Sequence, residues 1–474
     1  MLALLSSCGG SGGGSGGGSI TVAPTTPAPT ATSTPTPTAA AGCSLRERQD
    51  WAAATLREWY LFPETLPASL DPAPYPTVDT YIDALTATAR GQRRDRYFTY
   101  LTSIASEDAY YDSGESAGFG FRLGTNAAQG RLFVVESFEN APALAAGIDR
   151  GAEIVAIGTS AANLRNVSEI LASEGSAGLS TALGANTAGI SRVLRVTDAA
   201  GTRNVTVTKA TFDLLPVSSR YGAKIIDDGG RRVGYINLRS FIGTADQGLR
   251  QGFAQLRAAG VTDVIVDLRY NGGGLISIAE LFGDLLGRDR SSSDVFSYTT
   301  FRPEKASSNR TRTFAAQPES IAPTRIAFIG TGGTASASEL VINGFIPYLG
   351  TRMALVGTNT YGKPVGQVAI DRAACDDRLR VVALAVQNSA RSAAYYDGLA
   401  SVVPNSCQAG DDITYQLGDP REGSTRAALD FLAGRSCAPI GGARLRPEAV
   451  ADVTRQLVQP ERPDTIQREV PGAF

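Results

Sequence analysis

The chain has 474 residues, and a prior of roughly one domain per 150 residues predicts two or three folded units. Its 44 basic and 46 acidic side chains nearly cancel, which argues against DNA or RNA as a partner. The sequence contains no histidine, which excludes Ser-His-Asp catalysis, Cys-His catalysis and histidine-ligated metal sites. We therefore expect no metal and no other cofactor.

The N-terminus is a short apolar run that ends in small residues and Cys8. This run resembles the lipobox of a bacterial lipoprotein signal, although it lacks a basic start. The pattern predicts a signal remnant at 1–8 with lipidation of Cys8, and a disordered Gly/Ser and Thr/Pro tether at 9–41. An ordinary disordered tail is the alternative for 9–19. A lipid-anchored protein of this kind belongs to the cell envelope, at the outer membrane and facing the periplasm.

Four more cysteines follow, and none of them has a C-x-x-C spacing. In an exported chain, an even number of cysteines suggests two disulfides. Three pairings are possible, and loop lengths favour Cys375 with Cys407 and Cys43 with Cys437. Buried free thiols are the alternative.

Residues 42–111 have a helical pattern. Ser44 starts a Ser-x-x-Glu capping box, and Trp51, Leu56 and Trp59 recur at near-helical spacing. We expect a helical N-terminal cap.

Residues 112–214 change to short strand-like runs separated by glycines. The run "GFGF" and the later pattern "AxxAGIxxGxEI" within 139–158 resemble a PDZ domain. In such a loop, successive backbone N–H groups bind a carboxylate while a strand edge pairs with the rest of a peptide. The resemblance therefore implies a substrate carboxylate-binding loop made of Gly118, Phe119, Gly120 and Phe121. For "GFGF" alone, an ordinary hairpin is the alternative.

Residues 215–440 alternate strand-like and helical segments, which is typical of an α/β core. The strands "RVGYINLRSF", "VTDVIVDL", "RIAFIG" and "MALVG" stand out, with one amphipathic helix, "DQGLRQGFAQLRAAG". Loops after such strands line the functional crevice in α/β proteins. Three of them are 267–275, 330–339 and 357–367. We interpret 441–474 as a C-terminal tail.

These loops contain "NGGG", "SASE" and "GKPVGQ", and together they resemble the C-terminal processing peptidases. This serine peptidase family has a Ser/Lys dyad, an embedded PDZ domain and a crotonase/ClpP-like α/β core. The resemblance implies that Ser336 is the nucleophile, Lys363 the base and Gln367 the residue that orients the lysine. It implies peptide or protein substrates, cleaved near their C-terminal regions. Ser338 is the fallback nucleophile, because its spacing from the lysine suits the family better although its motif position does not.

The chemistry agrees with these roles. Lysine is the usual base where histidine is missing, and the chain has only four lysines. The ordinary lysine pKa of about 10.4 must fall before the amine can act as a base, and the apolar sequence around Lys363 is compatible with the burial that lowers it. The N–H groups of Ala337 and of Gly273 or Gly274 are candidates for an oxyanion hole.

Three alternatives remain open. Ser336 and Glu339 form a Ser-x-x-Glu pair that also fits a plain capping box at a helix start. The whole chain also fits a catalytically silent peptide-binding scaffold of the envelope, or a carrier of small hydrophobic ligands on the same core.

Overall fold

The computed structural model describes residues 41–441 and 455–474. The predicted signal remnant at 1–8, the lipidation of Cys8 and all but the last residue of the predicted tether at 9–41 lie outside the described residues. Within the described ranges, no helix has both the length and the apolarity needed to cross a bilayer.

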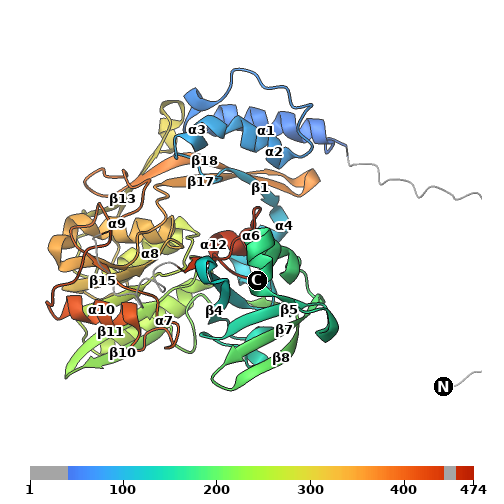
Figure 1. Ribbon diagram of the computed structural model, residues 1–474. Coiled ribbons are helices and arrows are strands. Elements are labelled where there is room, and N and C mark those ends of the chain that lie inside the picture. Colours follow the sequence, from blue (N-terminus) through green and yellow to red (C-terminus); the bar gives the residue numbers. More distant parts are fainter. Residues whose placement is uncertain (1–40, 442–454) are drawn as a thin grey trace, which may run out of the picture. The chain divides into compact units, whose positions relative to one another are not determined.

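A six-stranded sheet forms the predicted α/β core (Figure 1). From β11 onward its neighbouring strands are parallel, and β10 pairs antiparallel with β11. Side chains alternate between the faces: Val264 and Val266 pack with α7, α8 and α9, whereas Ile265 packs with α10. In spatial order the strands are β10 (Ala223–Asp228), β11 (Arg231–Asn237), β12 (Asp263–Asp267), β15 (Arg325–Gly330), β16 (Met353–Gly357) and β19 (Ser406–Gln408). The helices are α7 (Ala245–Ala258), α8 (Ile276–Leu286), α9 (Ala337–Leu349) and α10 (Gly423–Leu432).

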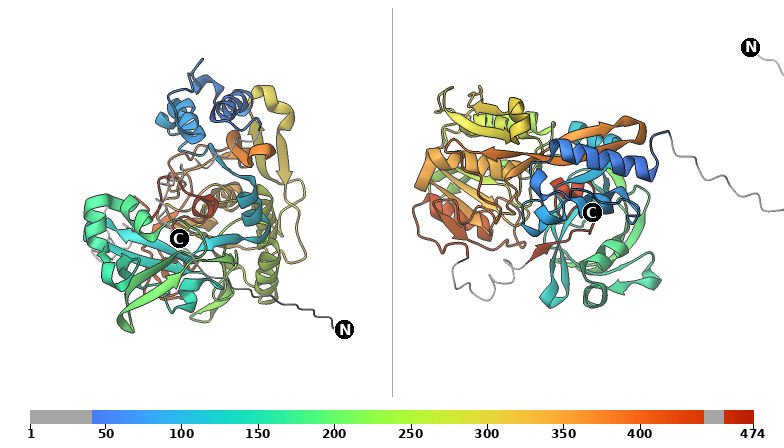
Figure 2. Two further views of the ribbon diagram at one scale, coloured as in Figure 1. Left: turned by 90° about the vertical axis from the view of Figure 1, so that its right-hand side faces the viewer. Right: turned by 90° about the horizontal axis from the view of Figure 1, so that it is seen from above.

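The N-terminal cap combines the expected helices with strands from distant parts of the chain. Ser44 forms its predicted capping box with Glu47 at the start of α1. Buried residues of α1 and α2 share one apolar cluster with β17 and β18, and Figure 2 shows α1 lying along these strands. The helices are α1 (Leu45–Trp59), α2 (Val78–Leu85), α3 (Ala87–Gly91) and α4 (Ile104–Ser113). The sheet contains β1 (Tyr100–Ser103), β13 (Val295–Phe301), β14 (Arg310–Thr313), β17 (Val365–Arg372) and β18 (Asp377–Gln387).

The region expected to be PDZ-like is rich in antiparallel strands, and we call residues 112–214 the PDZ-like region. Its main sheet has the order β20-β3-β4-β5-β7-β8, with β6 beside β5, and β2 pairs with β9. The strands are β2 (Glu115–Gly118), β3 (Phe121–Asn126), β4 (Arg131–Ser137), β5 (Glu153–Gly158), β6 (Arg165–Asn166), β7 (Ser191–Asp198), β8 (Gly201–Thr208) and β9 (Ala210–Asp213). The helices are α5 (Pro142–Ala145) and α6 (Val167–Leu183).

The end of the predicted tail is ordered. Residues 455–474, which we call the terminal segment, contain β20 (Gln456–Leu457) and α12 (Thr465–Glu469). Strand β20 pairs antiparallel with β3, so the terminal segment completes the sheet of the PDZ-like region.

The structure corrects the favoured disulfide pairing. Cys43 pairs with Cys375, and Cys407 pairs with Cys437. The turn between β17 and β18 carries Cys375, and this hairpin packs against the cap, which brings the cysteine to the start of α1. Cys407 lies on β19, where the following residue Gln408 donates its N–H to the carbonyl of Ala438, next to Cys437.

Buried ion pairs join the PDZ-like region to the α/β core. Arg239, just after β11, contacts Glu136 at 2.7 Å and Glu139 at 2.6 Å. Arg150 contacts Asp411 at 2.6 Å. Removing one partner of such a buried pair leaves an uncompensated charge, which costs about 3–5 kcal/mol. The two parts are therefore held together by more than a flexible linker.

Candidate active site

Three loops meet at one edge of the core sheet. They leave the carboxyl ends of β12, β15 and β16, which are parallel neighbours, so the loops emerge side by side. The Ala335 N–H donates to the Asn271 carbonyl at 3.0 Å, and the Tyr361 N–H donates to the Thr334 carbonyl at 2.9 Å. The three loops predicted from the sequence thus form one connected structure.

Ser336 stands at the N-cap of α9 in an unusual backbone conformation. Its φ is 55° and its ψ is −115°, a combination that is costly for a residue with a side chain. Its N–H donates to the carboxylate of Glu339 at 3.1 Å, as half of the capping-box alternative requires. The residue is only partly buried, so a tight turn presents this serine at the start of the helix.

Glu339 connects the serine loop to the lysine loop. Its side chain is 0% exposed, and the oxygen that accepts from Ser336 also accepts the Lys363 N–H at 2.7 Å. The other oxygen accepts from the Gly362 N–H at 2.7 Å and the Thr360 hydroxyl at 2.6 Å. Burial raises the pKa of this carboxyl, while the four donors oppose that shift. Sequence reasoning gave Glu339 only a capping role, although its place in the serine motif was a signal.

Lys363 places its amine between the Gln367 side chain and the Phe98 ring. Its Nζ donates to Gln367 Oε1 at 3.0 Å and lies 5.1 Å from the centre of the Phe98 ring. Gln367 in turn donates to the Phe98 carbonyl oxygen, which fixes its amide. Burial lowers the pKa of the Lys363 ammonium below its ordinary value, and the carboxylate of Glu469 partly opposes that shift. Lys363 and Gln367 are therefore brought together as the resemblance implied.

The glycine loop packs directly against Ser336. Gly273 has a φ of +122°, and a Cβ on it would lie 2.7 Å from the Ser336 Cβ, so only glycine fits. Its N–H donates to Asn271 Oδ1 at 2.9 Å. Gly274, with a φ of +130°, lies against the Phe241 backbone. Ala337 is the first residue of α9, where backbone N–H groups have no partner within the helix.

Ser338 has a different environment from Ser336. Its side chain is 0% exposed, and its hydroxyl donates to the Asn271 carbonyl at 3.0 Å. This bond ties the start of α9 to the glycine loop. The geometry gives Ser338 a positioning role in the loop.

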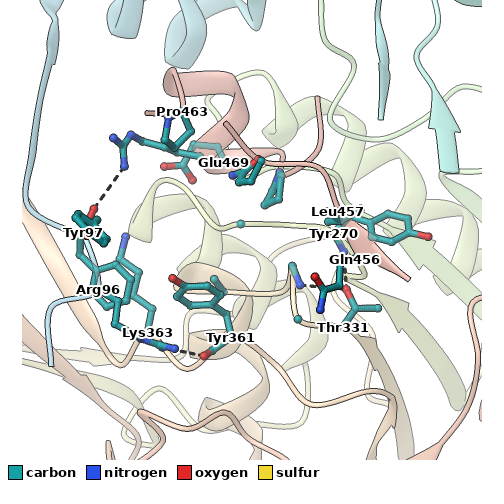
Figure 3. A pocket seen from close by; sticks show the side chains of 18 of the residues that line it. Arg96, Tyr97, Tyr270, Thr331, Tyr361, Lys363, Gln456, Leu457, Pro463 and Glu469 are labelled. Atoms are coloured by element: carbon teal, nitrogen blue, oxygen red, sulfur yellow. Dashed lines mark hydrogen bonds between the residues drawn. The ribbon is translucent and has the colours of Figure 1, made fainter. Parts of the chain in front are cut away.

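A cavity of about 760 Å³ opens beside these loops. Ala335, the neighbour of Ser336, and Lys363 line it. Figure 3 shows Pro463 and Glu469 of the terminal segment across the cavity from Lys363. The cavity therefore lies between the candidate catalytic loops and the chain's own last residues.

The predicted carboxylate-binding loop lies at the start of β3. Phe119 and Phe121 are buried in the apolar cluster of the PDZ-like region. Gly120 has a φ of +80°, and its N–H donates to the carbonyl oxygen of Phe474 at 2.9 Å. A Cβ on Gly118 would lie 2.8 Å from the Phe474 carbonyl carbon. The four predicted residues thus surround the last residue of the sequence.

Comparison with known proteins places these loops in one family. Residues 232–390 match Peptidase family S41. The chain is 31% identical over 255 residues to the carboxyl-terminal-processing protease of Picosynechococcus sp., a match that covers 53% of this chain and 55% of that protein. It is 26% identical over 253 residues to the protein of the same name from Synechocystis sp., covering 53% and 54%. The chain thus spans about half the length of each relative.

A solved S41 protease from Bacteroides fragilis has the same fold. It superposes with a TM-score of 0.63 at 21% identity, over 81% of this chain and 97% of that one. The family match includes all three loops of the candidate site. Residues 232–390, which contain the candidate site, thus match Peptidase family S41, and the chain is similar to carboxyl-terminal-processing proteases.

Proposed function

We propose that this protein is a serine endopeptidase that cleaves peptides or proteins near their C-terminal regions. One observation carries the proposal: a single carboxylate oxygen of Glu339 accepts the backbone N–H groups of both Ser336 and Lys363. This shared carboxylate anchors the backbones of the proposed nucleophile and the proposed base. The PDZ-like region recruits the substrate in this proposal.

In the first step, neutral Lys363 accepts the hydroxyl proton of Ser336 while Oγ attacks the scissile carbonyl carbon. The C–N bond then breaks, the leaving amine takes the proton from the lysine, and an acyl ester remains on the serine. Water, deprotonated by the same lysine, hydrolyses this ester. Gln367 accepts one hydrogen bond from Nζ and so orients the amine.

The negative oxygen of the tetrahedral intermediate needs fixed donors. The Ala337 N–H at the start of α9 is one candidate, and it also benefits from the positive end of the helix dipole. Because the Gly273 N–H already donates to Asn271, Gly274 is the better candidate of the two glycines for the second donor.

The test compares cleavage of an unstructured protein by the wild type and by Ser336→Ala, Ser338→Ala and Lys363→Ala. We expect Ser336→Ala and Lys363→Ala to be inactive and Ser338→Ala to retain activity. A wild type that cleaves nothing would refute the peptidase proposal and favour the peptide-binding scaffold. Loss of activity in Ser338→Ala but not in Ser336→Ala would show that the nucleophile is wrongly assigned.

We propose further that a lipid on Cys8 anchors the protein in the cell envelope, facing the periplasm at the outer membrane. The two disulfides support an oxidising compartment. In cells, Cys8→Ser should move the protein from the membrane fraction to the soluble fraction. Unchanged membrane association would contradict the anchor.

A further inference from the structure

The last residues of the chain lie along β3 as an added antiparallel strand. Ala473 is opposite Arg122. The Phe474 N–H donates to the Phe121 carbonyl at 3.0 Å, and the Leu123 N–H donates to the Gly472 carbonyl at 2.8 Å. Together with the bond from Gly120 to Phe474, this is how a peptide is bound by strand addition.

The side chains of these residues fit the site closely. Phe474 is 4% exposed and belongs to the same buried cluster as Phe119, Phe121, Leu179 and Leu183. Gly472 has a φ of +86°, and a Cβ there would lie 2.9 Å from the Leu123 carbonyl oxygen. Ala473 is 1% exposed. The site therefore holds one large aromatic side chain, preceded by two small residues.

The preceding part of the terminal segment reaches the candidate active site. The Gly272 N–H of the glycine loop donates to the Glu469 carbonyl at 2.9 Å. The Glu469 carboxylate accepts from the Tyr111 hydroxyl at 3.0 Å, and it is close enough to Lys363 to influence its charge. The same 20 residues thus touch both the β3 edge and the catalytic loops.

The residues around 472–474, which we call the β3 groove, are Gly118–Leu123 together with Leu179 and Leu183 of α6. We propose that residues 471–474 are a built-in ligand of this groove, and that the groove takes protein C-termini that end in a large aromatic residue after two small residues. A substrate of this class must displace 471–474 before it binds. This inference rests on the proposed function for its link to substrates, but the binding it describes does not require catalysis. A tethered segment acts at an effective concentration on the order of 1 mM. It therefore competes successfully against a free peptide of similar affinity that is present at micromolar concentration.

The test measures binding of a labelled hexapeptide with the sequence of residues 469–474 and a free carboxylate, by fluorescence anisotropy. The protein is the full chain with Ser336→Ala, which prevents cleavage. Adding Phe474→Asp should weaken the built-in ligand and tighten peptide binding at least tenfold, whereas Phe474→Leu, the matched apolar control, should change it less. Equal affinity for all three proteins would overturn the proposal.

A groove variant provides the second arm. A side chain at Gly118 would meet Phe474 first, and the next nearest atom is 3.7 Å away. Gly118→Val should therefore abolish peptide binding in the Phe474→Asp background without disturbing the fold. Undiminished binding would show that the peptide sits elsewhere.

Peptide variants test the ligand class. A peptide ending in aspartate, and the original peptide with an amidated end, should each bind at least tenfold more weakly. Equal binding of either would refute recognition of an aromatic chain end.

A further experiment is used if Phe474→Asp lowers the melting temperature of the protein. In that case, hydrogen exchange measured on the Ser336→Ala protein replaces the binding comparison with the Phe474→Asp variant. Saturating peptide should then speed exchange at 472–474, and unchanged exchange would refute displacement. Because every readout is binding, a chain without peptidase activity would still give these results.

Discussion

The carboxylate of Glu339 provides the sharpest test of the site. Glu339→Gln keeps the shape but has only one acceptor oxygen. With that oxygen placed on the Ser336 and Lys363 N–H groups, the new NH₂ faces Thr360, whose hydroxyl can turn to accept, and the Gly362 N–H, which cannot. One buried backbone donor is left unsatisfied, which costs about 1–3 kcal/mol of unfolding free energy. Because the serine and lysine loops lose part of their common anchor, we also expect kcat to fall by about tenfold or more.

Urea unfolding, followed by circular dichroism, measures the first effect, and cleavage of an unstructured protein measures the second. Glu422→Gln is the matched control. Glu422 is also 0% exposed and accepts backbone N–H groups at the start of α10. It pairs in addition with Arg269 at 2.9 Å, which increases the expected loss of stability, but it bonds neither Ser336 nor Lys363. The control should lose stability and keep kcat within a few-fold. If Glu339→Gln matches the wild type in both measurements, or if both variants lose kcat equally, the anchoring role is refuted.

Three further predictions concern the same structure. Burial lowers the Lys363 pKa, and the neutral amine is the proposed base. The cleavage rate should therefore rise with pH to a plateau, with a midpoint below 10.5, the ordinary lysine pKa. A cleavage rate that falls over this pH range would contradict the dyad. Gly273→Ala puts a methyl group 2.7 Å from the Ser336 Cβ and should lower kcat about a hundredfold, and a variant of normal activity would show that the loop does not need this close approach. Replacing Cys43 and Cys375 by serine opens a link across 332 positions and should lower the unfolding free energy by about 3–5 kcal/mol, as urea unfolding would show; an unchanged midpoint would mean that the link adds no stability.

The α/β core was predictable because each strand and helix has its own local pattern. "VTDVIVDL" contains β12, "RIAFIG" is β15 and "MALVG" is β16. The glycine, serine and lysine loops followed from these strands, because the ends of parallel strands lie at one edge. In this part of the chain, the local sequence pattern of each element agrees with its position in the folded core.

The cap sheet and the disulfides depend on distant contacts, which local patterns do not contain. Strand β1 pairs with β18, so that Tyr100 lies opposite Arg380, and no feature of residues 42–111 indicates that partner. The same pairing carries Cys375 to the start of α1, which is why loop lengths gave the wrong disulfides. The terminal segment was missed for a related reason. The sequence Pro-Gly-Ala-Phe has no periodicity that would predict a strand, and its conformation depends on pairing with β3, which lies far away in the sequence.

The proposed base and nucleophile belong to different parts of the fold. Ser336 begins a helix of the α/β core, whereas Gln367 lies on β17 of the cap sheet, and the ring beside Lys363 is Phe98, in the apolar cluster of the cap. Burial lowers the Lys363 pKa below its ordinary value, and this shift should be lost if the cap leaves the core. If mild heating loosened the cap before the core, the lysine would regain its charge and the proposed cleavage would stop, so thermal inactivation would precede melting of the core.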